Sequence, residues 1–272
     1  FKPVKCGMND AAAMLGVQCA LEGTEDVDID EQIALVRGAM DHGCDGIALS
    51  IIHPTAFAPI IEEAGARGVP MVAFNVDASH GASGCLSAIC QDFVKAGRVL
   101  GRAAAQALPK GAHVLLTLHS EGISALEERA AGAKEPLSKR EITCHKLVTG
   151  IEPDGAAMRI HAAIEEHPEI AGIMCTGLAD MLGASRVVEG ASEARVYVAG
   201  FDVAPEVLGL IRSGLVAFTI DQQPYVQGFY PVLQLALYCR YGIAPTDIDA
   251  GANVIGPEDV DRVMEASLAG YR

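Results

Sequence analysis

The 272-residue chain carries 35 acidic and 20 basic side chains, a formal net charge of −15, and half of its residues are hydrophobic. This acidity argues against a nucleic-acid partner, because binding to a phosphate backbone requires clustered Lys and Arg. No run approaches the roughly 18 apolar residues of a membrane-spanning helix, and the first ten residues lack the apolar middle of a signal peptide. The composition indicates a globular protein with a sizeable core, either one large α/β domain or two lobes.

The first third of the chain alternates predicted helices with predicted strands. Apolar residues at helical spacing, followed by Gly16, predict an opening helix over residues 1–15. Further amphipathic runs predict helices over residues 30–42, 54–68 and 92–108. Short apolar runs predict strands over residues 17–21, 46–52, 71–74 and 85–90.

The same alternation continues to the end of the chain. Strands are predicted over residues 113–118, 141–148, 170–175, 195–199, 215–220 and 252–255. Helices are predicted over residues 124–137, 154–167, 177–189, 205–212, 225–241 and 257–269. Strands that alternate with helices of this length predict an α/β fold with parallel sheets and right-handed crossovers.

Residues 196–228 combine a strand, a short helix, a second strand and a polar turn. Phe201 and Asp202 follow the first strand, and a carboxylate with two amides, residues 221–223, follows the second. Open α/β sheets bind ligands at the carboxyl ends of their strands. Carboxylates and amides can hydrogen-bond hydroxyl groups while a ring covers an apolar face, so this stretch predicts a polyhydroxylated ligand.

The chain resembles the periplasmic sugar-binding proteins of ABC transporters, the ribose- and galactose-binding group. The resemblance covers nearly the whole sequence and rests on four elements: GFD at Gly200–Asp202, TIDQQPYVQG at Thr219–Gly228, Phe74-Asn75 after an apolar strand, and SALEER at Ser124–Arg129. It implies a type I periplasmic-binding-protein fold, in which two Rossmann-like lobes with parallel sheets flank a hinged cleft. The expected lobes are residues 1–91 with 222–250, and residues 92–221 with 251–272.

The resemblance also implies a function. We expect a solute-binding protein, monomeric and located in the periplasm or at the cell surface, that captures a small neutral sugar or polyol between its lobes for an ABC-transporter permease. The effector-binding core of a lac-repressor-type transcription regulator, without its DNA-binding segment, shares this fold and is the alternative. In the resembled family a strand precedes the first helix, so we expect a strand ahead of Phe1, between the strands at 17–21 and 46–52.

The candidates for ligand binding differ in the alternatives that each leaves open. Asp202 and Gln222 stand at strand ends and match binding positions of the family, and loop capping is their alternative. Asn75 matches a sugar-binding Asn or Asp, and a turn is its alternative. Arg129 matches an Arg that donates to sugar hydroxyls, and a solvated Arg or a surface Glu–Arg pair is its alternative. The remaining candidates are Phe1, which would stack on the ligand or pack in the core, Thr176, where the family often has Asn, and His53 and His119, which follow apolar strands.

Motifs of catalysis and metal binding are not found in the sequence. It has no G-x-G-x-x-G fingerprint, no phosphate-binding loop and no H-E-x-x-H pair, and its eight cysteines include no C-x-x-C pair. We therefore expect no enzyme activity, no cofactor and no metal site, with a sugar-modifying α/β enzyme as a further alternative.

Overall fold

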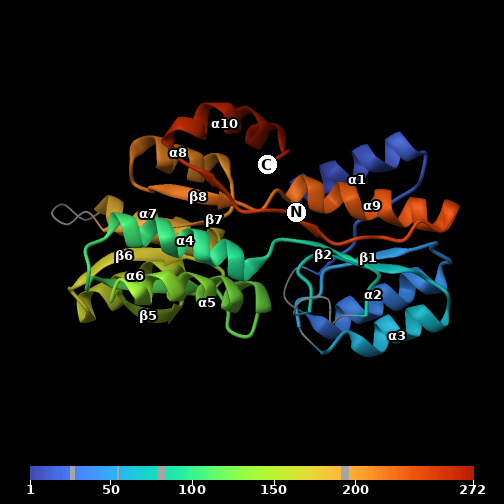
Figure 1. Ribbon diagram of the computed structural model, residues 1–272, viewed down its shortest axis with the longest axis horizontal. Helices are drawn as coiled ribbons and strands as arrows, with labels where there is room; N and C mark the ends of the chain where they lie inside the picture. The colour runs from blue at the N-terminus through green and yellow to red at the C-terminus, as the bar shows by residue number, and fades with distance from the viewer. Residues whose placement is uncertain (25–27, 54, 79–83, 191–195) are drawn as a thin grey trace. The chain divides into compact units, whose positions relative to one another are not determined.

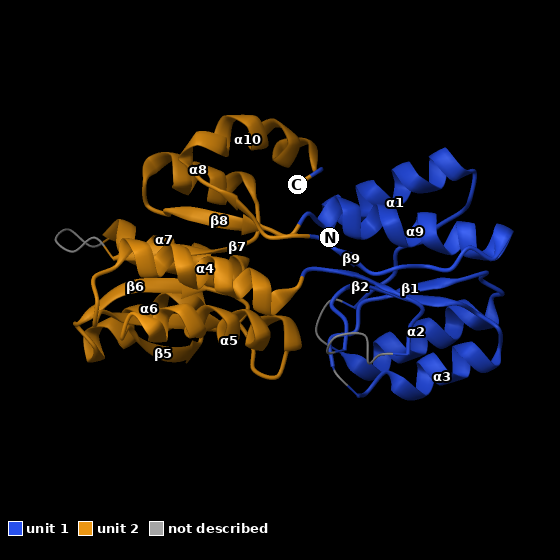
Figure 2. Ribbon diagram, in the orientation of Figure 1, with its two compact units in different colours: residues 1–91, 223–250, 271 blue, residues 92–222, 251–270, 272 orange. Residues whose placement is uncertain are grey.

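The computed structural model describes residues 1–24, 28–53, 55–78, 84–190 and 196–272. The chain divides into two compact units, coloured separately in Figure 2. Unit 1 comprises residues 1–91, 223–250 and 271, and unit 2 comprises residues 92–222, 251–270 and 272. Gln222, which we expected in the first lobe, lies in unit 2, where its side chain bonds with Arg129 and Asp202.

Unit 1 is built on a parallel four-stranded sheet with the order β1-β2-β3-β9. Its strands are β1 (Ile47–Leu49), β2 (Met71–Asn75), β3 (Ala88–Cys90) and β9 (Ile248–Asp249). Its helices are α1 (Lys2–Leu15), α2 (Ile29–Asp41), α3 (Ala58–Ala66) and α9 (Pro224–Tyr241). Apolar side chains of α2 and α3 form one core with β1 and β2, while α1 packs on α9, which contacts β2 (Figure 1).

The predicted strand at residues 17–21 is wrong. This segment is neither helix nor strand, and residues 18–23 are exposed. A strand must exchange backbone hydrogen bonds with a neighbour, and within the described ranges β1 ends the sheet and pairs only with β2. The strands expected at 46–52 and 85–90 are shorter for the same reason, since only Ile47–Leu49 and Ala88–Cys90 take part in the ladder. A strand ahead of Phe1 stays a prediction.

Unit 2 contains a six-stranded sheet with the order β10-β8-β7-β6-β4-β5, in which only β10 runs antiparallel to its neighbour. The strands are β4 (His113–Leu118), β5 (Thr143–Val148), β6 (Ile170–Cys175), β7 (Tyr197–Phe201), β8 (Phe218–Asp221) and β10 (Asn253–Ile255). The helices are α4 (Phe93–Ala107), α5 (Ser124–Lys139), α6 (Pro153–Glu166), α7 (Leu178–Gly190), α8 (Pro205–Ser213) and α10 (Val260–Ala269).

Alternate side chains of the unit 2 strands enter two separate cores. Successive residues of a strand point to opposite faces of the sheet, so Leu116 packs with α4 and α5, whereas Leu115 packs with α6, α7 and α8. The predicted α/β class with parallel sheets is confirmed. The polar candidate residues of unit 2 follow the carboxyl ends of these strands, outside the two cores.

Helices α4 and α5 approach each other closely at glycines. A Cβ atom at Gly97 would meet the carbonyl oxygen of Arg129, and one at Gly132 would meet the carbonyl oxygen of Val94. Any larger side chain at these positions must therefore push the helices apart. The contact fixes the backbone of α5 at Arg129.

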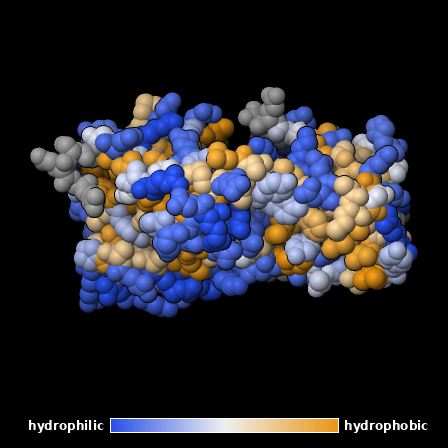
Figure 3. Space-filling view, turned by 90° about the horizontal axis from the view of Figure 1, so that it is seen from above, coloured by the Kyte–Doolittle hydropathy of each residue, from blue (hydrophilic) through white to orange (hydrophobic). Residues whose placement is uncertain are grey.

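On the face shown in Figure 3, hydrophobic residues are interspersed among hydrophilic ones, as is usual for folded proteins. Among the described residues, no helix combines the length and the apolar character that crossing a membrane requires. The longest of the helices named above, α9, belongs to unit 1, and its buried residues include the polar side chains of Gln227 and Gln234.

Candidate functional site

Four predicted ligand-binding residues of unit 2 follow four strands that are neighbours in its sheet. Gln222 follows β8 and Asp202 follows β7. Thr176 follows β6, and His119 follows β4. These strands are adjacent in the order β8-β7-β6-β4 and run parallel, so their carboxyl ends meet at one edge of the sheet.

A chain of hydrogen bonds links three of the predicted residues. The guanidinium of Arg129 donates through Nη2 to Gln222 Oε1 at 3.1 Å, and Gln222 Nε2 donates to Asp202 Oδ1 at 2.6 Å. We call Arg129, Gln222 and Asp202 the strand-end group. Its two bonds fix the orientation of the Gln222 amide, because the oxygen faces a donor and the nitrogen faces an acceptor.

Arg129 is held within unit 2 rather than on its surface. Only 4% of the residue is exposed, and its Nη1 donates to the carbonyl oxygen of Thr176 at 3.0 Å. The guanidinium lies 4.2 Å from the ring centroid of Phe201 and 5.2 Å from that of Phe93, where the ring faces attract a cation. Burial lowers the pKa of Arg129, and the nearby carboxylates of Asp202 and Asp180 oppose that shift. The surface ion pair considered for Arg129 is therefore wrong.

Asp202 has both a capping role and a position at the site. Its Oδ2 accepts from the backbone N–H of Leu178, the first residue of α7, at 3.1 Å, so the carboxylate lies at the positive end of that helix. A carboxylate offers about four lone-pair sites, so these bonds leave capacity for further donors. The residue has a φ of 77°, a left-handed conformation that is uncommon outside glycine and is concentrated at functional sites.

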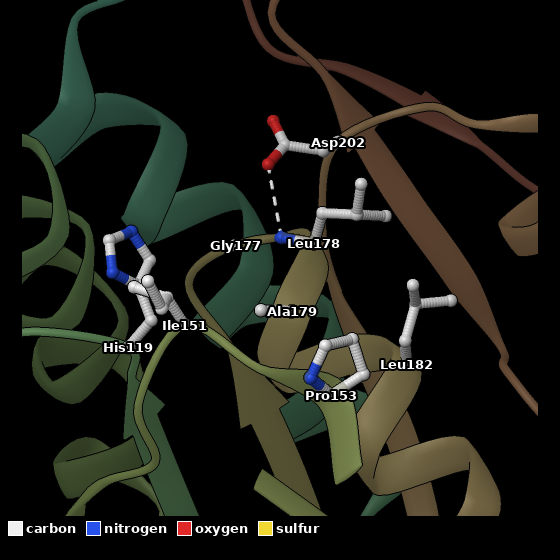
Figure 4. A pocket seen from close by; sticks show the side chains of 8 residues that line it. All are labelled: His119, Ile151, Pro153, Gly177, Leu178, Ala179, Leu182 and Asp202. Atoms are coloured by element: carbon white, nitrogen blue, oxygen red, sulfur yellow. Dashed lines mark hydrogen bonds between the residues drawn. The ribbon is translucent and has the colours of Figure 1, made fainter. Parts of the chain in front are cut away.

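A pocket of about 340 Å³ opens beside Asp202. Its lining combines apolar and polar side chains contributed by His119, Ile151, Pro153, Gly177, Leu178, Ala179, Leu182 and Asp202. Figure 4 shows these residues, with a dashed line from the Asp202 carboxylate to the Leu178 nitrogen. Lining of this kind, mainly apolar with a few polar groups, is typical of small-molecule sites. His119, whose Nδ1 lies 2.9 Å from Ser120 Oγ, is thus brought into the same pocket as Asp202.

Asp180 was missed by the sequence analysis. It is fully buried, and its Oδ2 is 3.1 Å from both donors that it accepts from, the Thr117 hydroxyl and the Thr176 backbone N–H. Burial raises the pKa of Asp180, and the neighbouring His119 opposes that shift. In the sequence it stands in a predicted helix with no distinguishing neighbour. Asp180 meets these two donors only in the folded unit, where the start of α7 lies next to the carboxyl ends of β4 and β6.

Thr176 contributes to the site through its backbone. Its side chain is fully buried, and its hydroxyl has no hydrogen-bond partner among the described residues. Its carbonyl oxygen accepts from Arg129 and its N–H donates to Asp180. Thr176 therefore joins the buried cation to a buried carboxylate.

Unit 1 brings two further candidates close to Phe74, near the end of β2. Asn75 ends this strand with a φ of 61°, and its Nδ2 donates to Ser50 Oγ at 3.2 Å. The positive φ supports the turn-forming alternative for Asn75, and contact of its side chain with a ligand stays a prediction. Phe1 is 69% exposed, and its ring lies edge-on to that of Phe74 with centroids 6.4 Å apart. Phe74 thus has the Asn75 amide next to it in sequence and the exposed Phe1 ring next to it in space.

His53 has contacts that support a structural role. Its Nδ1 accepts from the backbone N–H of Thr55 at 3.3 Å and from that of Ala56 at 3.2 Å. These two bonds close the turn that precedes α3. One ring nitrogen is therefore committed to the backbone of unit 1.

The strand-end group combines hydrogen-bond donors and acceptors. Asp202 supplies an acceptor, Arg129 a cationic donor and Gln222 both kinds of group. Hydroxyl groups both donate and accept, and the Asp202 carboxylate, which lines the pocket, keeps lone pairs for such a donor. A negatively charged ligand would be repelled by the Asp202 carboxylate.

A family model described as "Periplasmic binding protein domain" matches residues 1–242. The xylose/arabinose-binding protein XylF of Sulfolobus acidocaldarius is 26% identical over 283 aligned residues, covering 98% of this chain and 70% of that protein. The crystal structure of a carbohydrate transporter from Acidothermus cellulolyticus in complex with myo-inositol superposes with a TM-score of 0.89 at 29% identity, covering 99% of this chain and 93% of that chain. That of a periplasmic ribose ABC transporter from Conexibacter woesei has a TM-score of 0.85 at 26% identity, covering 100% and 92%. The chain belongs to the family described by the periplasmic binding protein domain.

Proposed function

We propose that the protein binds a neutral sugar or polyol and delivers it to the permease of an ABC transporter. The observation that carries the proposal is the chain of hydrogen bonds from Arg129 through Gln222 to Asp202 at the strand ends of unit 2. In these bonds a donor, an amide and an acceptor follow one another, and neighbouring hydroxyl groups of a ligand need both donors and acceptors. His119 would contact the ligand from the same pocket, while Asn75 and Phe1 would supply an amide and a ring from unit 1.

The names of the relatives support this class of ligand. XylF is named for xylose and arabinose, one similar structure is a complex with myo-inositol, and the other is named as a ribose transporter. All four are neutral molecules with several hydroxyl groups. Import binding proteins for ribose are also among the relatives, which favours transport over the transcription regulator. Membership of this family favours a periplasmic or cell-surface location, a monomer and the absence of catalytic turnover.

Thermal unfolding with a ligand panel tests the proposal. A ligand present at 100 times its Kd stabilises the folded state by about 2.7 kcal/mol, which corresponds to a rise in Tm of roughly 5–10 °C for a chain of this size. We expect such a rise with at least one neutral pentose, hexose or inositol at millimolar concentration. Sugar phosphates form the matched control, and we expect no rise with them because of Asp202. A rise with the phosphates alone, or with no member of the panel, contradicts the proposal.

A further inference from the structure

Three histidines and a glutamate gather at the edge of the unit 2 sheet opposite to the strand-end group. His113 begins β4, and His145 lies on β5. His167 is the C-cap of α6, and Glu169 directly precedes β6. We call these four residues the histidine cluster. The cluster lies toward the amino ends of the strands, whereas Asp202 and Gln222 follow the carboxyl ends of β7 and β8.

The sheet register explains why the ligating atoms meet. In the parallel β4–β5 ladder Leu115 is the partner of His145, so His113, two residues before Leu115, lies on the same face as His145. Leu115 packs in the core formed with α6, and α6 ends at His167 on that side. His113 also pairs with Ile170, the residue after Glu169. The fold therefore directs side chains from four separate segments to one place.

The distances in the cluster suit a shared ion. His113 Nδ1 lies 3.1 Å from His145 Nε2 and 3.4 Å from Glu169 Oε1. One ligand atom from each of these three residues lies within 4.8 Å of the others. In a tetrahedral zinc site with bonds of about 2.0–2.1 Å, neighbouring ligand atoms are about 3.3 Å apart. The two separations from His113 Nδ1 are close to that spacing, and the remaining one is within 4.8 Å.

A metal ion would satisfy all three of these atoms at the same time. Each nitrogen of a neutral imidazole is either a donor or an acceptor, so His113 Nδ1 cannot accept from His145 while it donates to Glu169. A cation accepts electron pairs from all three atoms together. The side chains of His113 and Glu169 are 33% and 46% exposed, which leaves an ion a path from solvent. The single carboxylate also offsets part of the charge of a divalent ion.

We propose that His113, His145 and Glu169 bind one divalent transition-metal ion, with Zn²⁺ the best fit. Imidazole and carboxylate are ordinary zinc ligands, and three protein ligands leave a fourth position for water. His167 acts as a positioning residue: its Nδ1 lies 3.4 Å from Glu169 Oε1, where it can orient the carboxylate. The ion would tie β4, β5 and the start of β6 together. These residues lie so far apart in the chain that they form no motif, and no metal site was therefore expected.

Calorimetric titration of the whole metal-free protein with Zn²⁺, and absorption spectroscopy with Co²⁺, test this proposal. We expect one site, and a visible Co²⁺ spectrum of low-symmetry four-coordination. His145→Gln and His113→Gln should each lower the affinity at least about 10-fold, and His167→Gln should lower it by about 10–100-fold. His161→Gln is the matched control, because His161 is exposed on α6 and pairs only with Glu165 among the contacts described.

Three results would overturn the proposal. The first is the absence of saturable Zn²⁺ binding up to about 1 mM, a concentration far above what structural zinc sites need. The second is a Zn²⁺ affinity that is unchanged in both His145→Gln and His113→Gln. The third is a loss of Zn²⁺ affinity in these two variants that is no larger than the loss in His161→Gln. Thermal unfolding of each variant without metal checks that the fold is retained. Sugar binding should be the same with and without Zn²⁺, so failure of this proposal is distinguishable from failure of the proposed function.

Discussion

At the scale of single residues, Asp202 carries the most specific prediction. Asp202→Ala removes the acceptor of the strand-end group and should weaken sugar binding by roughly 1.5–3 kcal/mol, the range for hydrogen bonds to charged groups. Asp261→Ala is the control, because its side chain is 93% exposed and bonds to Arg212 on the surface of unit 2. Calorimetry should show a loss of affinity in the first variant alone. Equal affinities in the two variants would remove Asp202 from the site.

Arg129→Lys tests whether the guanidinium itself is needed. Lysine keeps the charge but cannot donate from two fixed nitrogens or stack on a ring as Arg does, whereas Arg129 bonds to both Thr176 and Gln222. We expect sugar affinity to fall by about 1–3 kcal/mol, since the Gln222 amide loses its fixed donor. Arg98→Lys on the exposed face of α4 is the control. Wild-type affinity in Arg129→Lys, measured on a folded sample, would contradict this role.

The sequence identifies the members of the strand-end group but not their connections. Asp202, Gln222 and Arg129 are predicted one by one, from strand ends and family motifs. Their hydrogen bonds depend on the distance between α5 and the sheet, which no local pattern reports. Asp180 and the histidine cluster are not predicted at all, because each acquires a role only from residues that are remote in sequence.

At the scale of elements, helix packing sets the position of Arg129. Gly97→Ala places a methyl group against the Arg129 carbonyl oxygen, so we expect a loss of about 1–3 kcal/mol in unfolding free energy and weaker sugar binding. Gly209→Ala in α8 is the matched control: no atom lies within 4 Å of its Cβ position, and Ala favours a helix by about 0.5–1 kcal/mol. Denaturant unfolding measures both variants. A Gly97→Ala protein as stable as wild type would show that the α4–α5 contact tolerates expansion.

Elements with strong local signals are predicted well. The helix beginning after the N-cap Asp92 and the one ending at Gly214 have the expected bounds to within about two residues. The helix expected over residues 54–68 begins only at Ala58, and residue 54 lies outside the described ranges. The other failures lie at strands, because a strand depends on a partner that the local sequence does not specify. Residues 17–21 are apolar enough for a strand, yet they pair with no other strand in the described ranges. Strand β9 is not predicted, because it is short and only two of its residues pair with β3.

At the scale of the whole molecule, the chain passes between the two units after residues 91, 222 and 250. The family resemblance implies lobe boundaries at nearly the same places, and Gln222 and Tyr271 are the residues assigned to the other unit. Asn75 ends a strand of unit 1, and the strand-end group lies in unit 2. The hinged cleft between the lobes stays a prediction.

The proposed function requires that this protein binds a neutral, polyhydroxylated ligand. Isothermal titration calorimetry of the wild-type protein, with the panel member that raises the Tm most, tests it most directly. We predict saturable binding of one sugar or polyol per chain, with a Kd in the micromolar range or below, about −8 kcal/mol or stronger. Absence of binding heat for every neutral pentose, hexose and inositol at several temperatures, from protein that is folded and free of ligand, would contradict the account.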